Sequence, residues 1–295
     1  MRNKRKDIKM IIVEPTSGLC SRIFVISEAY ELAKKYNKKL VILWTKTTDC
    51  NIGYFDIFEK QQFSDIDLKV VEFVKFGIRV RDVNKKRVKA LFILIREVFI
   101  RLKYKILHTF YVKYYKSKSS IHKNAYLDGN SVMDEKLVKD NNCFIEAYNM
   151  ITGNSDLQAI KIKEEFVKEA EGIISPYLSH CVGIHIRRTD HQPAISESRT
   201  ESFVAEIRNI LKDDGSMYFY LSTDDWNEEK NLKEKFGNKI ITQPQKTLNR
   251  FTEDGMYSSI IDFLCLSRTN YIIGSFGSIF SKFSAQYGKI ELKIL

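Results

Sequence analysis

Residues 10–44, MIIVEPTSGLCSRIFVISEAYELAKKYNKKLVILW, decide the fold class of this chain. The apolar run at 10–15 predicts a strand, and the turn around Gly18 follows it. Apolar residues then recur at helical spacing until KKYNKK ends the helix before a second apolar strand at 40–44. A strand, a short glycine-containing loop, a helix and a second strand form the βαβ unit of a parallel sheet.

The second half of the sequence repeats this alternation. We place the domain boundary at 152/153, after a predicted strand at 143–148 and before a charged helix from about Leu157 to Ile174. Strands are expected at 181–187, 217–221, 239–242 and 270–274, alternating with helices at about 200–212, 226–236, 254–267 and 278–287. The pattern predicts two doubly wound Rossmann-like domains, 1–152 and 153–295, that face a cleft.

Composition excludes several classes of protein. With 295 residues and 44% hydrophobic residues, the chain can bury two cores of ordinary size. Its five cysteines form no C-x-x-C pair, which favours neither a disulfide framework nor a zinc site. The N-terminal apolar run is too short for a signal peptide, and no stretch approaches the ~18 apolar residues of a membrane span. We therefore expect a cytoplasmic protein.

The positive charge is concentrated in one segment. The net charge is +11, and residues 84–118 hold eleven Lys and Arg against Glu97 alone, which gives this segment +10. Periodicity over 88–115 predicts one long amphipathic helix, or two with a break near Lys103. The helix face is either solvated or contacts an anionic membrane at its inner surface. A non-enzymatic binder of nucleic acid or anionic surfaces stays an alternative, although the near-neutral remainder argues against a nucleic-acid partner.

Loops that follow strands are the places where an open α/β sheet binds its ligands. In the loop after the first strand, Gly18 allows close approach of the backbone, and the helix N-terminus behind it favours an anion. The alternative is a tight turn with a helix cap. A second loop, at 274–278, places Ser275, Phe276, Gly277 and Ser278 before the last long helix, where backbone donors could also hold an anion.

Charged side chains gather after the strand at 181–187. His185 and Arg187 share one face of this strand, and Arg188 and Asp190 follow it. Arginine presents a planar set of donors that suits bidentate binding of a phosphate. Adjacent guanidiniums repel each other unless an anion or a carboxylate separates them. We expect Asp190 to be the partner of Arg188, and a salt-bridge network that only orders the loop is the alternative.

Three aspartates complete the candidate site. Asp224 and Asp225 follow the strand at 217–221, where helix capping explains one of them and leaves the other for a second role. Such a pair can hold a divalent metal, but two arginines available for phosphates make a metal unnecessary. Asp262 lies among apolar residues and requires a specific donor, either the N1–H and exocyclic amine of a guanine or a salt-bridge partner. Together these features outline a nucleotide diphosphate site.

These motifs resemble those of a known enzyme family. HIRRTD at 185–190, STDD at 222–225 and LNRFTEDG…SIIDFLCLSRTNYIIGSFGS at 248–278 are similar to motifs of the α1,6-fucosyltransferases and the nodulation-factor fucosyltransferase, and more distantly of the protein O-fucosyltransferases. The loop and helix that begin at Ser17 resemble the N-terminal glycine loop of that family. The resemblance covers about residues 10–45 and 181–288.

The resemblance implies a GT-B fold and inverting, metal-independent transfer of fucose from GDP-fucose to a hydroxyl of a glycan or lipid-linked saccharide, as in the synthesis of bacterial surface polysaccharide. The N-terminal domain would bind the acceptor, and the C-terminal domain the nucleotide sugar. No cofactor is implied. Another nucleotide sugar is the alternative donor.

The resemblance also implies roles for individual residues. Arg187 would hold the β-phosphate and stabilise the charge that develops as GDP leaves. His185 would contact the nucleotide, Asp262 the guanine, and Ser275 to Ser278 the phosphates. Asp224, Asp225 and Arg250 match residues needed for donor binding or loop order, and Gly18, Arg188 and Asp190 complete the expected nucleotide-sugar site. Glu14, at the mouth of the first loop, is the candidate base, and capping of the following helix is its alternative role.

Overall fold

The computed structural model describes residues 9–74, 87–124, 134–148, 151, 153, 155–249 and 251–295. The chain divides into two compact units, Met1–Lys161 and Ile162–Leu295. This division falls nine residues after the boundary predicted at 152/153.

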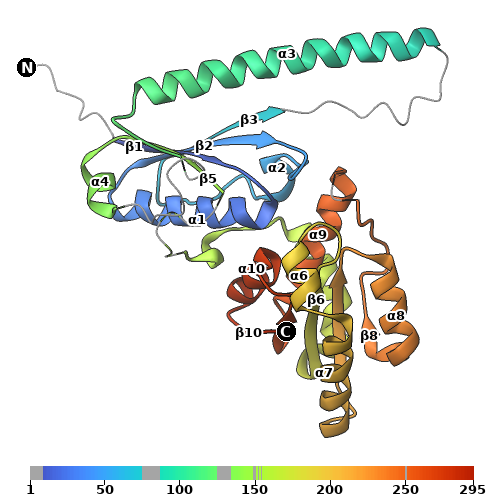
Figure 1. The fold of residues 1–295 in the computed structure, drawn as a ribbon. Coiled ribbons are helices and arrows are strands. Elements are labelled where there is room, and N and C mark those ends of the chain that lie inside the picture. The colour runs from blue at the N-terminus through green and yellow to red at the C-terminus, as the bar shows by residue number, and fades with distance from the viewer. Residues whose placement is uncertain are drawn as a thin grey trace, which may run out of the picture. The chain divides into compact units, whose positions relative to one another are not determined.

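The first unit contains a five-stranded parallel sheet with the order β3-β2-β1-β5-β4 (Figure 1). Its strands are β1 (Met10–Pro15), β2 (Lys39–Lys46), β3 (Leu68–Val74), β4 (Ile121–Asn124) and β5 (Cys143–Ala147). Its helices are α1 (Leu19–Lys35), α2 (Tyr54–Ile57), α3 (Arg87–Ser117), α4 (Glu135–Asp140) and the short 3-10 helix η2 (Leu157–Ala159).

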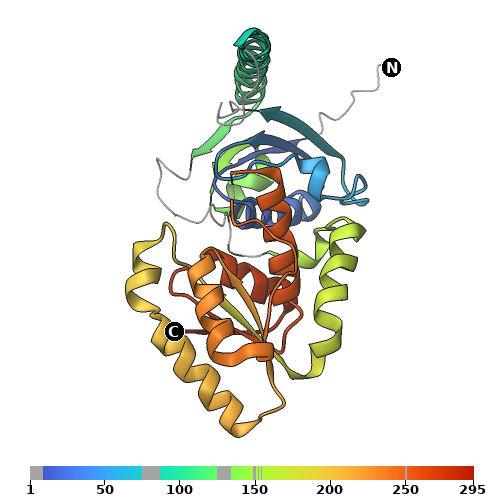
Figure 2. The same cartoon turned by 90° about the vertical axis from the view of Figure 1, so that its right-hand side faces the viewer.

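Helices α1 and α3 cover opposite faces of this sheet, as Figure 1 and Figure 2 show. The central strands β1 and β2 are almost continuously apolar because a parallel strand is buried on both faces. On the α3 side the core contains Ile12, Val41, Leu43, Phe73, Phe144 and Tyr115, with Leu107, Tyr111 and Val112 of α3 packed against it. Nearly every residue of α1 is buried.

The second unit contains another five-stranded parallel sheet, with the order β10-β9-β6-β7-β8. Its strands are β6 (Cys181–Ile186), β7 (Tyr218–Thr223), β8 (Ile240–Ile241), β9 (Tyr271–Gly274) and β10 (Glu291–Ile294). Its helices are α5 (Glu164–Ile174), α6 (Gln192–Glu197), α7 (Thr200–Asp213), α8 (Trp226–Phe236), α9 (Glu253–Leu266) and α10 (Ile279–Gly288), with 3-10 helices η3 (Ser175–His180) and η4 (Gly237–Lys239).

Strand order places the candidate site of the second unit. The chain passes from β6 to β7 and β8 on one side and then returns to β9 on the other side of β6. Ligands of open α/β sheets bind beyond the carboxyl ends of the strands at such a reversal. Apolar side chains of α7 and α8 form a core with β6 and β7 on one face of the sheet. Helix α9 also contacts β6 and β7. The loop 187–190 therefore lies at the reversal.

The predicted doubly wound α/β architecture is confirmed, and some of its elements differ from expectation. The predicted helix from Leu157 to Ile174 was wrong in its first part, because Leu157–Ala159 form a 3-10 turn and the α-helix begins at Glu164. Residues 87–117 form one helix, without a break near Lys103. Strands β3, β4 and β10 were not predicted. Within the part of the chain that the structure describes, no helix is long and apolar enough to cross a membrane.

Candidate functional site

A pocket of about 110 Å³ lies within the second unit, at the carboxyl ends of β6 and β7. Four of the predicted residues line it: His185, Arg187, Asp224 and Asp262. Side chains of α9 and α10 that were not predicted complete its wall, among them Ser258, Ser259 and Phe280. The structure therefore brings together residues that are up to about ninety positions apart in the sequence.

His185 is buried at the end of β6 and is uncharged. Its Nδ1 lies 2.7 Å from the hydroxyl of Ser281, and its ring packs against Phe280 with 4.9 Å between ring centroids. Burial, together with the nearby Arg187 guanidinium, lowers the pKa of His185 to about 3. A neutral imidazole here can donate a hydrogen bond to a ligand or accept one from it, but it contributes no positive charge at physiological pH.

Arg187 is the partly exposed cation at this pocket. Its backbone N–H donates to the hydroxyl of Ser275 over 3.1 Å, which fixes the residue at the end of β6. The guanidinium forms an ion pair with the carboxylate of Asp190, and 26% of the Arg187 side chain is exposed. The exposed donors of this guanidinium can therefore reach an anion at the mouth of the pocket.

The expected pairing of Arg188 with Asp190 was wrong. Asp190 pairs with Arg187 instead, because the loop turns after β6 and brings the two side chains together three residues apart. Arg188 points towards the first turns of α7 and α8. Its Nε lies 2.6 Å from the carboxylate of Glu228 on α8, and its Nη2 lies 3.1 Å from the hydroxyl of Thr200 on α7. Both members of the Arg188–Glu228 pair are only 10% exposed. A contact of Arg188 with the nucleotide stays a prediction.

Asp224 and Asp225 divide two structural tasks between them. Asp224 accepts hydrogen bonds from the backbone N–H of Arg188 over 2.7 Å and from the hydroxyl of Thr189 over 2.6 Å, so it orders the loop after β6. Asp225 is the N-cap of α8 and accepts from the N–H of Asn227 over 2.7 Å. The capping role predicted for one aspartate therefore belongs to Asp225.

Asp262 is buried on α9, and both of its carboxylate oxygens accept hydrogen bonds. The donors are the hydroxyls of Tyr220 at 2.6 Å and Ser222 at 2.9 Å, on neighbouring positions of β7. Burial raises the pKa of Asp262, against the opposing influence of Lys246 and of these two hydroxyls. Each carboxylate oxygen has a second lone pair, so the side chain can accept further donors from a ligand. The sequence alone did not reveal the partners, because Tyr220 and Ser222 are read there as strand and cap residues.

The loop before α10 uses part of its hydrogen-bonding capacity within the protein. The hydroxyl of Ser275 donates to the carbonyl of His185 over 3.2 Å, and the backbone N–H of Phe276 donates to the hydroxyl of Ser198 over 2.7 Å. Gly277 has φ +65°, a backbone conformation that residues with a side chain rarely adopt, and Ser278 is the N-cap of α10. These contacts fix the position of the loop beside β6. Contacts of Ser275 to Ser278 with phosphates stay predictions.

In the first unit, a buried arginine holds the glycine loop. Gly18 is the N-cap of α1, and Ser17 before it has φ +66°. The guanidinium of Arg22 is fully buried, donates to the carbonyl of Ser17 over 2.8 Å and lies over the ring of Trp44. Arg22 was not among the predicted residues, although it stands four positions after Gly18, on the next turn of the same helix.

Glu14 lies at the end of β1 and contacts α3. Its carboxylate is 2.6 Å from Nε2 of His108, and only 5% of the side chain is exposed. Glu146 of β5 occupies the position paired with Glu14 in the sheet, and it accepts a hydrogen bond from Asn124 over 2.9 Å. A carboxylate next to an imidazole can exchange a proton, so this pair has the chemistry of a general base.

Within the residues that the structure describes, no group of three or more His, Cys, Asp or Glu side chains could hold a metal ion.

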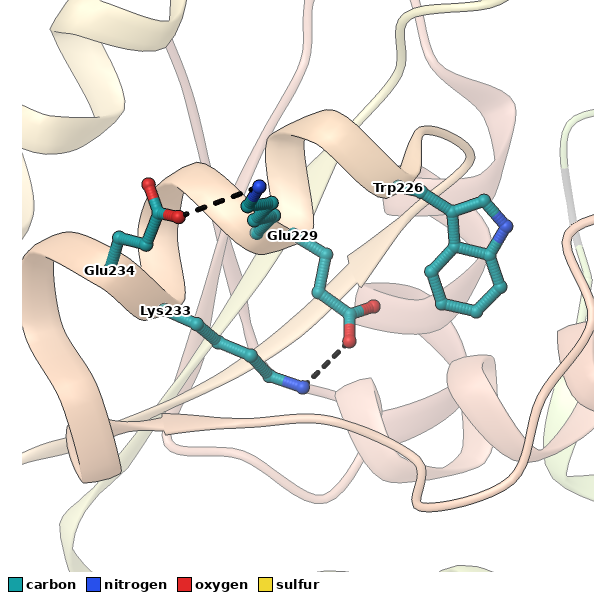
Figure 3. A pocket seen from close by; sticks show the side chains of 5 residues that line it. Trp226, Glu229, Lys233 and Glu234 are labelled. Carbon is teal, nitrogen blue, oxygen red and sulfur yellow. Dashed lines mark hydrogen bonds and ion pairs between the residues drawn. The ribbon is translucent and has the colours of Figure 1, made fainter.

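A hollow of about 400 Å³ lies along α8, and Figure 3 shows Glu229 and Lys233 directed towards each other there. Glu229 also pairs with Lys246 at 2.7 Å. The residues that line this hollow all belong to α8, and the Glu229–Lys246 pair connects the helix to the loop containing Lys246.

Arg250 belongs to the candidate site by resemblance, but it lies outside the described residues. The predicted donor-binding or loop-ordering role of Arg250 stays a prediction.

The two Rossmann-like units define the GT-B class of glycosyltransferase folds. The chain is similar in structure to the fucosyltransferase NodZ from Bradyrhizobium, with a TM-score of 0.56 at 15% identity over 94% of this chain and 92% of that chain. It is also similar to POFUT1 in complex with GDP-fucose, with a TM-score of 0.57 at 11% identity over 97% and 98% of the two chains. No family model and no curated protein sequence matches the chain.

Proposed function

We propose that the chain is an inverting glycosyltransferase that transfers fucose from GDP-fucose to a hydroxyl of a glycan or a lipid-linked saccharide, in the synthesis of a bacterial surface polysaccharide. The observation that carries the proposal is the pocket at the β6 reversal, which combines the exposed cation of Arg187 with the buried carboxylate of Asp262. The fold shared with NodZ and with POFUT1, whose structures contain GDP or GDP-fucose, supports the choice of donor.

The charge of Arg187 suits the chemistry of the step. Breaking the bond between the sugar and the diphosphate creates an oxocarbenium-like sugar and a more negative diphosphate. A fixed cation beside the leaving phosphate therefore stabilises the transition state more than the ground state. Asp224 supports this role indirectly, since its carboxylate holds the backbone of the loop in which Arg187 and Asp190 lie.

Asp262 and His185 suit recognition of the base. The N1–H and exocyclic amine of guanine are two adjacent donors, and the Asp262 carboxylate is an acceptor that lines the pocket. Neutral His185 lines the same pocket. The volume of about 110 Å³ is smaller than the ~300–1,000 Å³ usual for sites of small molecules, so this pocket would hold one part of a nucleotide sugar.

Glu14 is the proposed base for the acceptor hydroxyl. Its contact with His108 fixes the carboxylate at the end of β1, where loops of the first unit would bind the acceptor. We propose that the reaction requires no metal and that the enzyme acts in the cytoplasm.

Nucleotide binding is the first test of the proposal. GDP should raise the unfolding temperature more than UDP, ADP or CMP do, because only GDP presents both donors to Asp262. A larger shift with another nucleotide would favour the alternative, a GT-B enzyme with a different nucleotide sugar.

Transfer of radiolabelled fucose from GDP-fucose to a panel of glycan acceptors is the second test. Arg187→Ala should abolish most transfer and most GDP-fucose hydrolysis, whereas Arg208→Ala, at an exposed arginine on α7, should not. Equal activity of the Arg187→Ala variant and the wild type would remove the basis of the proposal. Nucleotide-independent binding to anionic surfaces or nucleic acid, without transfer, would support the non-enzymatic alternative.

A further inference from the structure

Helix α3 has apolar side chains on two opposite faces. Leu107, Tyr111, Val112 and Tyr115 pack against the sheet of the first unit. The opposite face carries Phe99, Leu102, Ile106 and Phe110, which are 68%, 53%, 59% and 62% exposed. We call these four residues the exposed stripe. Isolated apolar residues are common on protein surfaces, but four large side chains in a row are unusual and mark an interaction site.

Helix geometry makes the exposed stripe continuous. Its members are separated by three, four and four positions, so they lie along one side of a helix with 3.6 residues per turn. Figure 1 shows α3 with one side to the sheet and its other side turned away from the first unit. Tyr114, four positions after Phe110, is 47% exposed and extends the stripe towards the end of the helix.

Cations border the exposed stripe. Lys103, Lys105 and Lys113 are exposed, and Lys118 places its ammonium 5.9 Å from the ring of Tyr114. The sequence from 98 to 118 contains no aspartate or glutamate. Among residues 98–118, the charged side chains beside the stripe are therefore all basic.

We infer that α3 lies in the plane of an anionic lipid bilayer, with the exposed stripe inserted among the acyl chains and the lysines at the phosphate level. A helix with large apolar and aromatic side chains bordered by lysines binds membranes in this way. No described helix can cross a membrane, so α3 lies on the bilayer. Long lysine side chains can bury their methylene groups and still place the ammonium at the headgroups.

Charge and shape favour a bilayer over two other occupants. A second copy of the helix would place lysines against lysines, and residues 98–118 contain no acid to compensate them, which disfavours self-association. Nucleic acid would satisfy the lysines but would leave the four large apolar side chains against a charged phosphate backbone. Of these three occupants, the anionic bilayer is the one that satisfies both features.

Sedimentation with vesicles tests the inference on the full chain. The wild type should sediment with phosphatidylcholine vesicles that contain a third phosphatidylglycerol, and much less with pure phosphatidylcholine. The variant Ile106→Ser with Phe110→Ser should bind at least roughly a hundredfold more weakly, on the order of what two fully buried apolar side chains contribute. Its matched control is Leu137→Ser with Leu178→Ser, at two residues that are 46% and 45% exposed elsewhere on the surface.

A second pair of variants separates insertion from net charge. Lys103→Gln, Lys105→Gln and Lys113→Gln together should weaken vesicle binding about a hundredfold. The control variant Lys168→Gln, Lys212→Gln and Lys230→Gln removes the same charge from exposed positions of the second unit and should bind like the wild type. Equal losses in both triple variants would overturn the specific role of α3.

The insertion of the exposed stripe into the bilayer can be measured directly. The native cysteines, Cys20, Cys50, Cys143, Cys181 and Cys265, are all buried. An environment-sensitive dye on an Ile106→Cys variant should therefore label the stripe selectively and shift to the blue on anionic vesicles. An unshifted emission would overturn insertion.

Three further outcomes would overturn the inference: vesicle binding that survives Ile106→Ser with Phe110→Ser, a dimer that dissociates in this variant, or tighter binding to duplex DNA than to vesicles. The inference does not depend on the proposed transfer reaction. The Arg187→Ala variant should bind vesicles like the wild type, so loss of transfer and loss of membrane binding are separable results.

Discussion

Arg188 and Glu228 form a buried ion pair between the loop after β6 and the first turn of α8, with 2.6 Å between Nε and the carboxylate. The next residue towards the N-terminus, Arg187, keeps part of its guanidinium exposed beside the pocket. Two adjacent arginines therefore have different tasks. Arg188 holds the loop, and Arg187 is the one available to an anion.

Removing Arg188 should destabilise the fold. Arg188→Met leaves the Glu228 carboxylate without its cation in a buried position, which costs about 3–5 kcal/mol of unfolding free energy. Urea denaturation followed by circular dichroism measures the loss. The double variant Arg188→Met with Glu228→Leu should recover part of it, since no buried charge is left alone. A double variant less stable than either single variant would show that the pair does not act as a unit.

Removing Arg187 should affect catalysis far more than stability. The Arg187–Asp190 pair is partly exposed, so Arg187→Ala should change the unfolding free energy by less than about 1 kcal/mol. The turnover number for fucose transfer should fall by roughly 10²–10³-fold, as it does when a donor that stabilises transition-state charge is removed. Steady-state kinetics with saturating GDP-fucose provides the measurement. A change confined to KM would show that Arg187 binds the donor equally well in the ground state and in the transition state.

Asp262 should discriminate guanine from hypoxanthine. IDP lacks the exocyclic amine of GDP, so the wild type should bind IDP about tenfold more weakly, the effect of one hydrogen bond to a charged acceptor. Asp262→Asn should lower affinity for GDP and reduce this difference. Titration calorimetry with both nucleotides measures the two affinities. A ratio of GDP affinity to IDP affinity that is the same in the wild type and the variant would show that the guanine does not bind at Asp262.

Stability should depend on pH through His185. The pKa of His185 is lowered to about 3 in the folded chain, whereas the unfolded chain takes up the proton near pH 6.5. The unfolded state therefore binds more protons between these values, and the free energy of unfolding falls as pH decreases from about 6.5 towards 3. The contribution reaches about 1.4 kcal/mol per pH unit.

The difference between the wild type and His185→Gln isolates this effect, because other titrating groups contribute equally to both proteins. The wild type should lose stability more steeply than the variant over that pH range. If the free energy of unfolding falls with pH equally in the two proteins, His185 accepts a proton in the folded state.

Transfer should continue after treatment with EDTA. The proposal assigns stabilisation of the leaving diphosphate to Arg187, so chelation should leave the initial rate unchanged within experimental error. Loss of activity that added Mg²⁺ or Mn²⁺ restores would contradict the metal-independent mechanism.

Much of the fold could be predicted because strong local patterns coincide with the final structure. The predicted helices at 226–236 and 254–267 are long and periodic and begin after good N-cap residues. The predicted strand at 10–15 is mainly apolar. The structure contains all three elements within a residue or two of the predicted bounds. Strand β10 (ELKI) was not predicted because it is short, and only its pairing with β9 stabilises it as a strand. Local sequence carries no signal for such pairing.

The site could be predicted in part for a related reason. His185, Arg187 and Asp262 could be found because charged or polar residues stand out at strand ends or in apolar surroundings. The partner of Arg188 could not be found, because Glu228 is forty positions away on an ordinary charged helix, and only the packing of α8 against β7, the neighbour of β6, brings it near. Nearness in sequence favoured Asp190 and misled the prediction.

The two sheets have a consequence for how the chain unfolds. Each sheet is built from strands of one unit, and among the described residues one core cluster around Ile12 and another around Val182 each draw their side chains from a single unit. We therefore expect cooperative unfolding within each unit and more than one melting temperature for the chain. Calorimetry should resolve two transitions. GDP and the Arg188→Met substitution should each move the transition of Ile162–Leu295, which would identify the unit that melts in each step.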